Sequence, residues 1–355
     1  MHAFARRLPD TLSPRAIFEH LDRFVIGQER AKRALAIAAY NHMRRVGLRG
    51  APRPAASAGL LKKSNVLLIG PTGCGKTHLA RHLATALDVP FAVVDATEYT
   101  EAGYHGRDVE QMVTELLLAA DQDAEACGRG IIFIDEVDKI ARRTHGAHTG
   151  AGARDIGGEG VQQSLLKLLE GREVFVPLSH AQGFARQDFV TVDTTDILFI
   201  CAGTFSDLRP APGEERALGF NRRACGEGAP AARIGARELC EFGMLAEFVG
   251  RLPVIVELEP LGEDEMLEIL TTPPDSIVRE FRERLALDGV AVEFETAALR
   301  RVVEHANRRG LGARALRGIL EEVMGDVMFR APELDDDRLL IDEAFVVEQL
   351  AALSG

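Results

Sequence analysis

The segment GPTGCGKT, residues 70–77, has the residue types and spacing of a phosphate-binding loop. It follows the apolar run NVLLI and precedes the helical pattern HLARHLATAL, so it connects a strand to a helix. Its glycines let backbone N–H groups wrap a phosphate, and the helix N-terminus favours negative charge. The predicted nucleotide contacts are Pro71, Thr72, Gly73, Cys74, Gly75, Lys76, Thr77 and His78.

Lys76 is expected to reach the outer phosphates, and Thr77 is expected to ligate Mg²⁺. A second motif, which is acidic, lies downstream in IIFIDEVD, where four apolar residues are followed by Asp135. Parallel sheets bind ligands at this end of a strand, so Asp135 can hold the Mg²⁺ shell. Glu136 can polarise an attacking water. Adjacent acids can also be a solvated strand end, but together with the phosphate-binding loop they predict nucleotide hydrolysis.

Two arginines are candidates for the transition state of that reaction. Arg251 lies in EFVGRLP, and Arg314 lies in GLGARALR. Either one alone can be ordinary surface charge. A phosphoryl-transfer enzyme, however, gains rate from a cation that reaches the γ-phosphate from a neighbouring subunit or a moving domain.

The elements that must position these residues follow an α/β pattern. Apolar β-branched runs alternate with amphipathic helical patterns, which predicts a parallel central sheet covered on both faces. We expect a short tail at residues 1–12, a large nucleotide-binding domain at 13–258 and a smaller, mostly helical domain at 259–355. Residues 205–237 interrupt the pattern with Gly, Pro and charge, and we expect a mobile loop that binds a partner.

Composition restricts the possible partners and compartment. The net charge of −12 argues against general binding to nucleic acid or to anionic membranes. No apolar run is long enough to span a bilayer, and no secretory signal is visible. The five cysteines include no C-x-x-C pair, which indicates free thiols in a reducing cytoplasm and gives no sign of zinc.

With these motifs in place, the chain resembles the ClpX family of AAA+ unfoldases over roughly residues 10–345. The segment DRFVIGQERAKRALAIAAYNH resembles the family's adenine-binding segment, which implies that Val25 and Ile26 contact the base of ATP. GRGIIFIDEVDKIAR resembles its Walker B segment, and GPTGCGKT its Walker A segment. The resemblance implies a homo-hexamer in which Arg251 acts across a subunit interface and Arg314 acts within its own subunit.

The resemblance also implies where protein substrates and a peptidase bind. Tyr104 and His105 fall on the first pore loop, and Arg154 falls on the second. The tripeptide Leu218, Gly219 and Phe220 matches the loop that anchors the family to the ClpP peptidase. The expected partners are therefore ClpP and unfolded or tagged proteins.

Two departures from the family pattern limit these expectations. No cysteine precedes Cys74, so recruitment of adaptors through the family's four-cysteine zinc domain is not expected. Gln182, Gly183 and Phe184 stand where the family has a basic loop, which weakens the expected preference for its usual tag. The alternative is a remodelling chaperone that works without proteolysis. A P-loop kinase or nucleic-acid motor fits the acidic chain less well.

Overall fold

The computed structural model describes residues 12–47, 63–100, 107–142, 158–177, 189–208, 233–333 and 338–352. The chain divides into two compact units. The first is built mainly from Ala34–Ile69 and Leu83–Glu257, and the second from Arg15–Arg33, Gly70–His82 and Leu258–Gly355. No helix within the described segments is long and apolar enough to cross a membrane.

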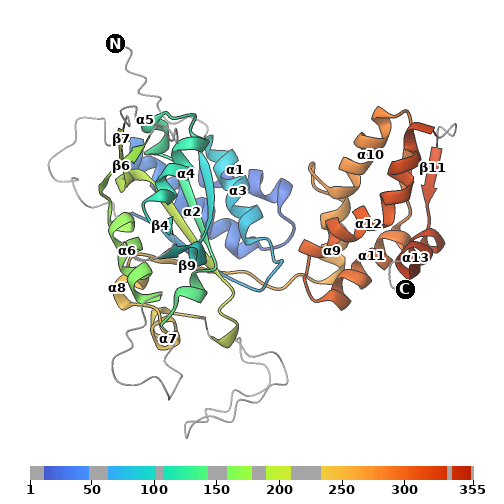
Figure 1. The fold of residues 1–355 in the computed structure, drawn as a ribbon. Helices are drawn as coiled ribbons and strands as arrows, with labels where there is room; N and C mark the ends of the chain where they lie inside the picture. The colour runs from blue at the N-terminus through green and yellow to red at the C-terminus, as the bar shows by residue number, and fades with distance from the viewer. Residues whose placement is uncertain are drawn as a thin grey trace, which may run out of the picture. The chain divides into compact units, whose positions relative to one another are not determined.

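A five-stranded parallel sheet lies at the centre of the first unit (Figure 1). Its strands run in the order β2-β5-β8-β1-β9. Their bounds are β1 (Val66–Ile69), β2 (Phe91–Asp95), β5 (Ile131–Asp135), β8 (Leu198–Gly203) and β9 (Val254–Glu257). Since β8 pairs in parallel with both β1 and β5, Ile69 and Asp135 end at the same edge of the sheet.

Helices precede the sheet and connect its strands. The loop at residues 25–28 separates the first two helices. The helices of this part of the chain are α1 (Pro14–Phe24), α2 (Glu29–Gly47), α3 (Lys76–Leu87), α4 (Gln111–Ala119), α5 (Ala124–Cys127), α6 (Gly158–Glu170), α7 (Ala236–Phe242) and α8 (Ala246–Gly250). Two short strand pairs complete it: β3 (Tyr99–Thr100) with β4 (Arg107–Asp108), and β6 (Glu173–Pro177) with β7 (Phe189–Asp193).

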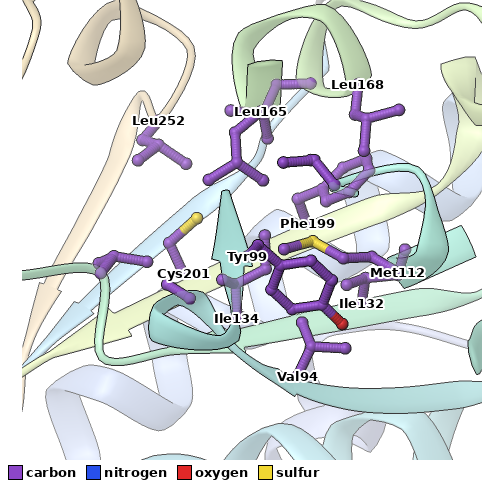
Figure 2. Close-up of a cluster of buried hydrophobic side chains, with 14 of the residues drawn as sticks. Val94, Tyr99, Met112, Ile132, Ile134, Leu165, Leu168, Phe199, Cys201 and Leu252 are labelled. Carbon is purple, nitrogen blue, oxygen red and sulfur yellow. The ribbon is translucent and has the colours of Figure 1, made fainter. Parts of the chain in front are cut away.

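The sheet is buried on both faces. Every residue of β1 and of β8 is buried, and successive side chains of a strand point to opposite faces. On one face, Met112 of α4 and Leu165 of α6 pack in one apolar cluster with Ile132 and Phe199 of the sheet (Figure 2). The predicted α/β fold with a covered parallel sheet is therefore confirmed.

The C-terminal part of the chain is mostly helical, as predicted. Its elements are α9 (Glu263–Thr271), α10 (Ile277–Leu287), β10 (Ala291–Phe294), α11 (Thr296–Arg309), α12 (Arg314–Arg330), β11 (Arg338–Ile341) and α13 (Glu343–Ala352). Val302 and Ala306 of α11 are fully buried in a core that α9, α12 and α13 share with it. The strands β10 and β11 form a parallel pair.

Both described ends of the predicted loop at residues 205–237 are ordered. Phe205 is buried, and its ring centroid lies 5.2 Å from that of Phe242. Ser206–Leu208 forms a 3-10 turn, and α7 begins at Ala236. The Gly- and Pro-rich part of this loop begins only after Phe205 and the 3-10 turn. It comprises residues 209–232, which lie outside the described residues.

Candidate active site

The phosphate-binding loop leaves β1 directly and ends in the first turn of α3. Gly73 and Gly75 have φ angles of +77° and +94°, a region that favours glycine. Lys76 is only 8% exposed, and its ammonium donates to the carbonyls of Gly70 (2.7 Å) and Pro71 (3.0 Å). The loop thus wraps around the lysine that the sequence analysis predicted to reach the outer phosphates.

The loop packs against the segment that leads into α12. A Cβ atom on Gly73 would lie 2.4 Å from the carbonyl oxygen of Leu311 and 3.1 Å from Cα of Gly312, so a larger residue does not fit. Arg314, the first residue of α12, is exposed just beyond this contact. A pocket of about 210 Å³ lies here, lined by Pro71, Thr72, Gly73, Cys74, Pro260, Leu261, Asn307, Gly310 and Gly312.

The loop between α1 and α2, predicted to contact the base, is held in place by two sets of hydrogen bonds. The buried Lys32 donates to the carbonyl of Val25 at 3.0 Å. The amide of Gln28 exchanges bonds of 2.7 and 3.0 Å with the backbone of Glu259. Val25 itself is buried and Ile26 half-buried. Their contact with the base stays a prediction.

The two acids lie at and just after the end of β5. Asp135 is its last residue and accepts a bond of 2.9 Å from the backbone N–H of Glu136. Glu136 is exposed and has left-handed backbone angles, φ 57° and ψ 31°, which are uncommon outside glycine. Such conformations concentrate at functional positions.

The turn that carries Glu136 is fixed by the buried Asp138. This carboxylate accepts bonds from the backbone N–H of Thr204 at 3.2 Å and from its hydroxyl at 2.9 Å. Thr204 directly follows β8, the neighbouring strand of the sheet. Neither residue was predicted from the sequence. The available signals were the acid that ends the segment DEVD and the threonine directly after the apolar run LFICAG.

Arg251, the second arginine candidate besides Arg314, caps the end of α8. Its guanidinium pairs with Glu170 at 2.5 Å, and both side chains are about half exposed, at 52% and 44%. Exposed ion pairs of this kind contribute about 0–1 kcal/mol, so the guanidinium can leave at little cost. The backbone of Arg251 is firmly held, because the buried Asn65 donates to its carbonyl at 3.1 Å and accepts from the N–H of Phe199. Asn65 was also missed; it opens the strand pattern NVLLI.

The predicted residues fall into three groups. Val25, Ile26, residues 70–78 and Arg314 belong to one compact unit, whereas Asp135, Glu136 and Arg251 belong to the other. The remaining predictions lie outside the described residues: Tyr104, His105, Arg154, Leu218, Gly219 and Phe220. Beside the first of these loops, β3 and β4 pair Tyr99 with Arg107, which brings the two flanks of residues 101–106 together.

Comparison with known proteins finds both parts of this architecture. Residues 61–255 match the AAA domain of the Cdc48 subfamily, and residues 261–336 match the C-terminal D2-small domain of ClpB protein. The chain is 44% identical over 341 residues to "ATP-dependent Clp protease ATP-binding subunit ClpX 2" of Wolinella succinogenes, which covers 96% of this chain and 83% of that relative. ClpX subunits are also similar in Porphyromonas gingivalis, with 43% identity over 350 residues (96% and 83% covered), and in Borrelia duttonii, with 43% over 326 residues (90% and 75%).

Proposed function

Because the chain belongs to the ClpX family of AAA+ ATPases, we propose that it uses ATP hydrolysis to unfold proteins and to deliver them to a ClpP peptidase. The observation that supports ATP hydrolysis is the conformation of the phosphate-binding loop. Its left-handed glycines curve the backbone around the buried Lys76 ammonium. A cation held in this way suits the phosphates of a nucleotide.

Each nucleotide-site residue has a defined task in this proposal. Lys76 exchanges its bonds with the loop carbonyls for the outer phosphates of ATP, and Thr77 and Asp135 hold Mg²⁺. When bound, Mg²⁺ neutralises phosphate charge. The donor set fits a hard cation, because it offers a hydroxyl and a carboxylate oxygen. Val25 and Ile26 contact the adenine base.

Glu136 orients the attacking water and accepts its proton. Its exposed carboxylate projects from a backbone that Asp138 and Thr204 hold in place, so the base is positioned before substrate arrives. The left-handed conformation of Glu136 supports this assignment.

We assign the two arginines to different subunits of a homo-hexameric ring. Arg251 leaves its weak pair with Glu170 and reaches the nucleotide of a neighbouring subunit. Arg314 acts on the nucleotide of its own subunit, and its place at the start of α12, next to the P-loop contact with residues 311–312, supports this. Residues 13–258 then form the nucleotide-binding domain and residues 259–355 the lid.

The protein-handling residues follow from the family alone. Tyr104, His105 and Arg154 grip a polypeptide in the central channel, and Leu218, Gly219 and Phe220 insert into ClpP. We place this work in the cytoplasm. Neither nucleic acid nor membrane is part of the proposal.

The test is ATP-dependent unfolding of a tagged fluorescent protein, followed by loss of fluorescence with and without added ClpP. We expect unfolding that needs ATP, and degradation that needs both ClpP and residues 218–220. Degradation that survives deletion of these three residues contradicts the assigned contact. Unfolding without any ClpP-dependent degradation favours the remodelling chaperone instead. Robust ATP hydrolysis with no unfolding of any tail contradicts the proposal as a whole.

A further inference from the structure

Two histidines and one aspartate gather beside the helix that follows the phosphate-binding loop; only His78 among them is a predicted nucleotide contact, and none is assigned a step in the proposed reaction. His78 and His82 lie one turn apart on α3, and Asp275 comes from the connection between α9 and α10. Each residue offers one nitrogen or oxygen atom, and these three atoms lie within 4.8 Å of one another. All three residues belong to the same compact unit.

We propose that His78, His82 and Asp275 form a binding site for Zn²⁺, with a water molecule as the fourth ligand. An H-x-x-x-H spacing on a helix presents two imidazoles to one ion. Nε2 of His82 lies 3.3 Å from a carboxylate oxygen of Asp275. Tetrahedral Zn²⁺ with bonds near 2.0–2.1 Å separates its ligand atoms by about 3.3 Å. His78 and Asp275 are exposed side chains that can adjust to the remaining geometry.

The donor set selects the class of metal. Imidazole nitrogen suits Zn²⁺ and its neighbours among the transition metals, whereas Mg²⁺ and Ca²⁺ prefer a full set of oxygen ligands. Burial and the neighbouring His78 lower the pKa of His82, although Asp275 opposes the shift. Zn²⁺ binds the neutral form of imidazole, which this direction of shift favours.

The surroundings hold the His82 ring in place and leave it short of partners. Phe24 stacks on the ring with centroids 4.3 Å apart, and His20 packs beside it at 6.3 Å. Among the described residues, Nδ1 of His82 and Nε2 of His20 are buried without a hydrogen-bond partner. These two nitrogens are not the proposed ligands, because the metal takes Nε2 of His82, the atom that lies 3.3 Å from Asp275.

His78 is oriented in the way expected of a metal ligand. One nitrogen of its ring lies 3.2 Å from the carbonyl oxygen of Phe24. Metal-binding histidines generally use one ring nitrogen for a carbonyl or carboxylate and the other for the metal. The cysteines of the sequence gave no sign of a zinc site. The proposed site uses no thiol, so it does not depend on them.

Zn²⁺ at this position ties the helix that begins at Lys76 to the connection between α9 and α10. The site closes a long loop of the chain, so the metal stabilises the folded state. The expected effect is a rise in the melting temperature on addition of Zn²⁺, which requires neither nucleotide nor a protein partner.

The experiment titrates Zn²⁺ alone into the full chain after chelator treatment, without nucleotide, by calorimetry and by thermal denaturation. We expect His78→Gln, His82→Gln and Asp275→Asn each to weaken binding by at least about tenfold and to abolish the rise in melting temperature. His305→Gln, which removes a histidine of α11 outside the cluster, should leave both unchanged.

Equal Zn²⁺ binding by the wild type and the three cluster variants overturns the proposal. An equal loss of binding in His305→Gln also overturns it, because it would show general imidazole binding. His78 and Asp275 are exposed, so their variants keep the test decisive if the half-buried His82→Gln fails to fold.

Discussion

At the scale of single residues, Glu136 combines an exposed carboxylate with a strained, fixed backbone. We expect Glu136→Gln to keep nucleotide binding and to lower ATP turnover by about 10²–10⁴-fold, the usual contribution of a general base. Glutamine preserves the size of the side chain but cannot take a proton from water. Phosphate release and binding of a fluorescent nucleotide measure the two effects separately. Glu348→Gln, the same substitution at an exposed position of α13, is the control. Turnover that survives Glu136→Gln contradicts the assignment.

Alanine substitutions at Gly73 and Gly75 distinguish the cost of a strained backbone angle from the cost of a steric clash. Both have positive φ angles, but only Gly73 faces a close neighbour, the carbonyl of Leu311 at 2.4 Å, whereas a Cβ on Gly75 meets nothing within 4 Å. Alanine in either position strains the backbone by about 1–3 kcal/mol. We expect Gly73→Ala to lower the melting temperature further, because it must also displace the segment before α12. Equal shifts for Gly73→Ala and Gly75→Ala would contradict the contact.

At the scale of elements, the bond between Asp138 and Thr204 connects the turn after β5 to the end of β8. Thr204→Val removes the hydroxyl bond of 2.9 Å to a buried carboxylate. We expect a loss of about 1–3 kcal/mol in the free energy of unfolding. We also expect a fall in ATP turnover, because the turn that holds Glu136 loosens. Urea unfolding and phosphate release measure both. Thr191→Val, on the exposed side of β7, is the matched control and should change neither.

The elements that could be predicted from the sequence are those with strong local patterns. The runs that became β1, β2, β5 and β8 are apolar and β-branched, and the phosphate-binding loop is one continuous motif. The strand β9 was missed although Val254, Ile255 and Val256 are β-branched, because this short run directly follows the Arg251 motif at the expected domain boundary.

The missed parts of the site depend on contacts between distant segments. Asn65 meets Arg251 because the sheet places β9 beside β1, and Asp138 meets Thr204 because the sheet places β8 beside β5. The histidine pair of α3 was visible as H-x-x-x-H, but nothing in the sequence marks Asp275 as its third member. Spacing along the chain predicts that His78 and His82 share one face of a helix, but only the tertiary structure shows that Asp275 lies beside them.

At the scale of the whole molecule, the first unit contains a buried group of polar side chains that has no part in the proposed nucleotide site. His42 of α2 is 2% exposed. Arg45 lies one turn further along the helix and pairs with Asp196 at 3.0 Å, and Lys63 donates to the carbonyl of Thr194. Burial, reinforced by the positive charges of Arg45 and Lys63, lowers the pKa of His42 to about 3. The folded protein therefore holds this ring neutral.

This burial makes the stability of the molecule depend on pH. In the unfolded chain the ring takes up a proton below about pH 6.5, whereas in the folded protein it does so only near the lowered pKa. The contribution of His42 is thus complete above about pH 6.5 and is lost as the pH falls toward 3, by about 1 kcal/mol per pH unit. We expect a loss of about 2 kcal/mol in the free energy of unfolding between about pH 7 and pH 5.

His42→Leu isolates this contribution, because leucine keeps an apolar side chain in the buried position and cannot titrate. Urea unfolding between about pH 5 and pH 8 should then show a shallower decline with acid than in the wild type. Between about pH 7 and pH 8 the two proteins should differ by a constant amount, since an unfolded histidine is already neutral there. Parallel curves across the whole range would mean that His42 takes up its proton at the same pH in the folded and unfolded states, and that burial beside the arginine and lysine does not keep the ring neutral.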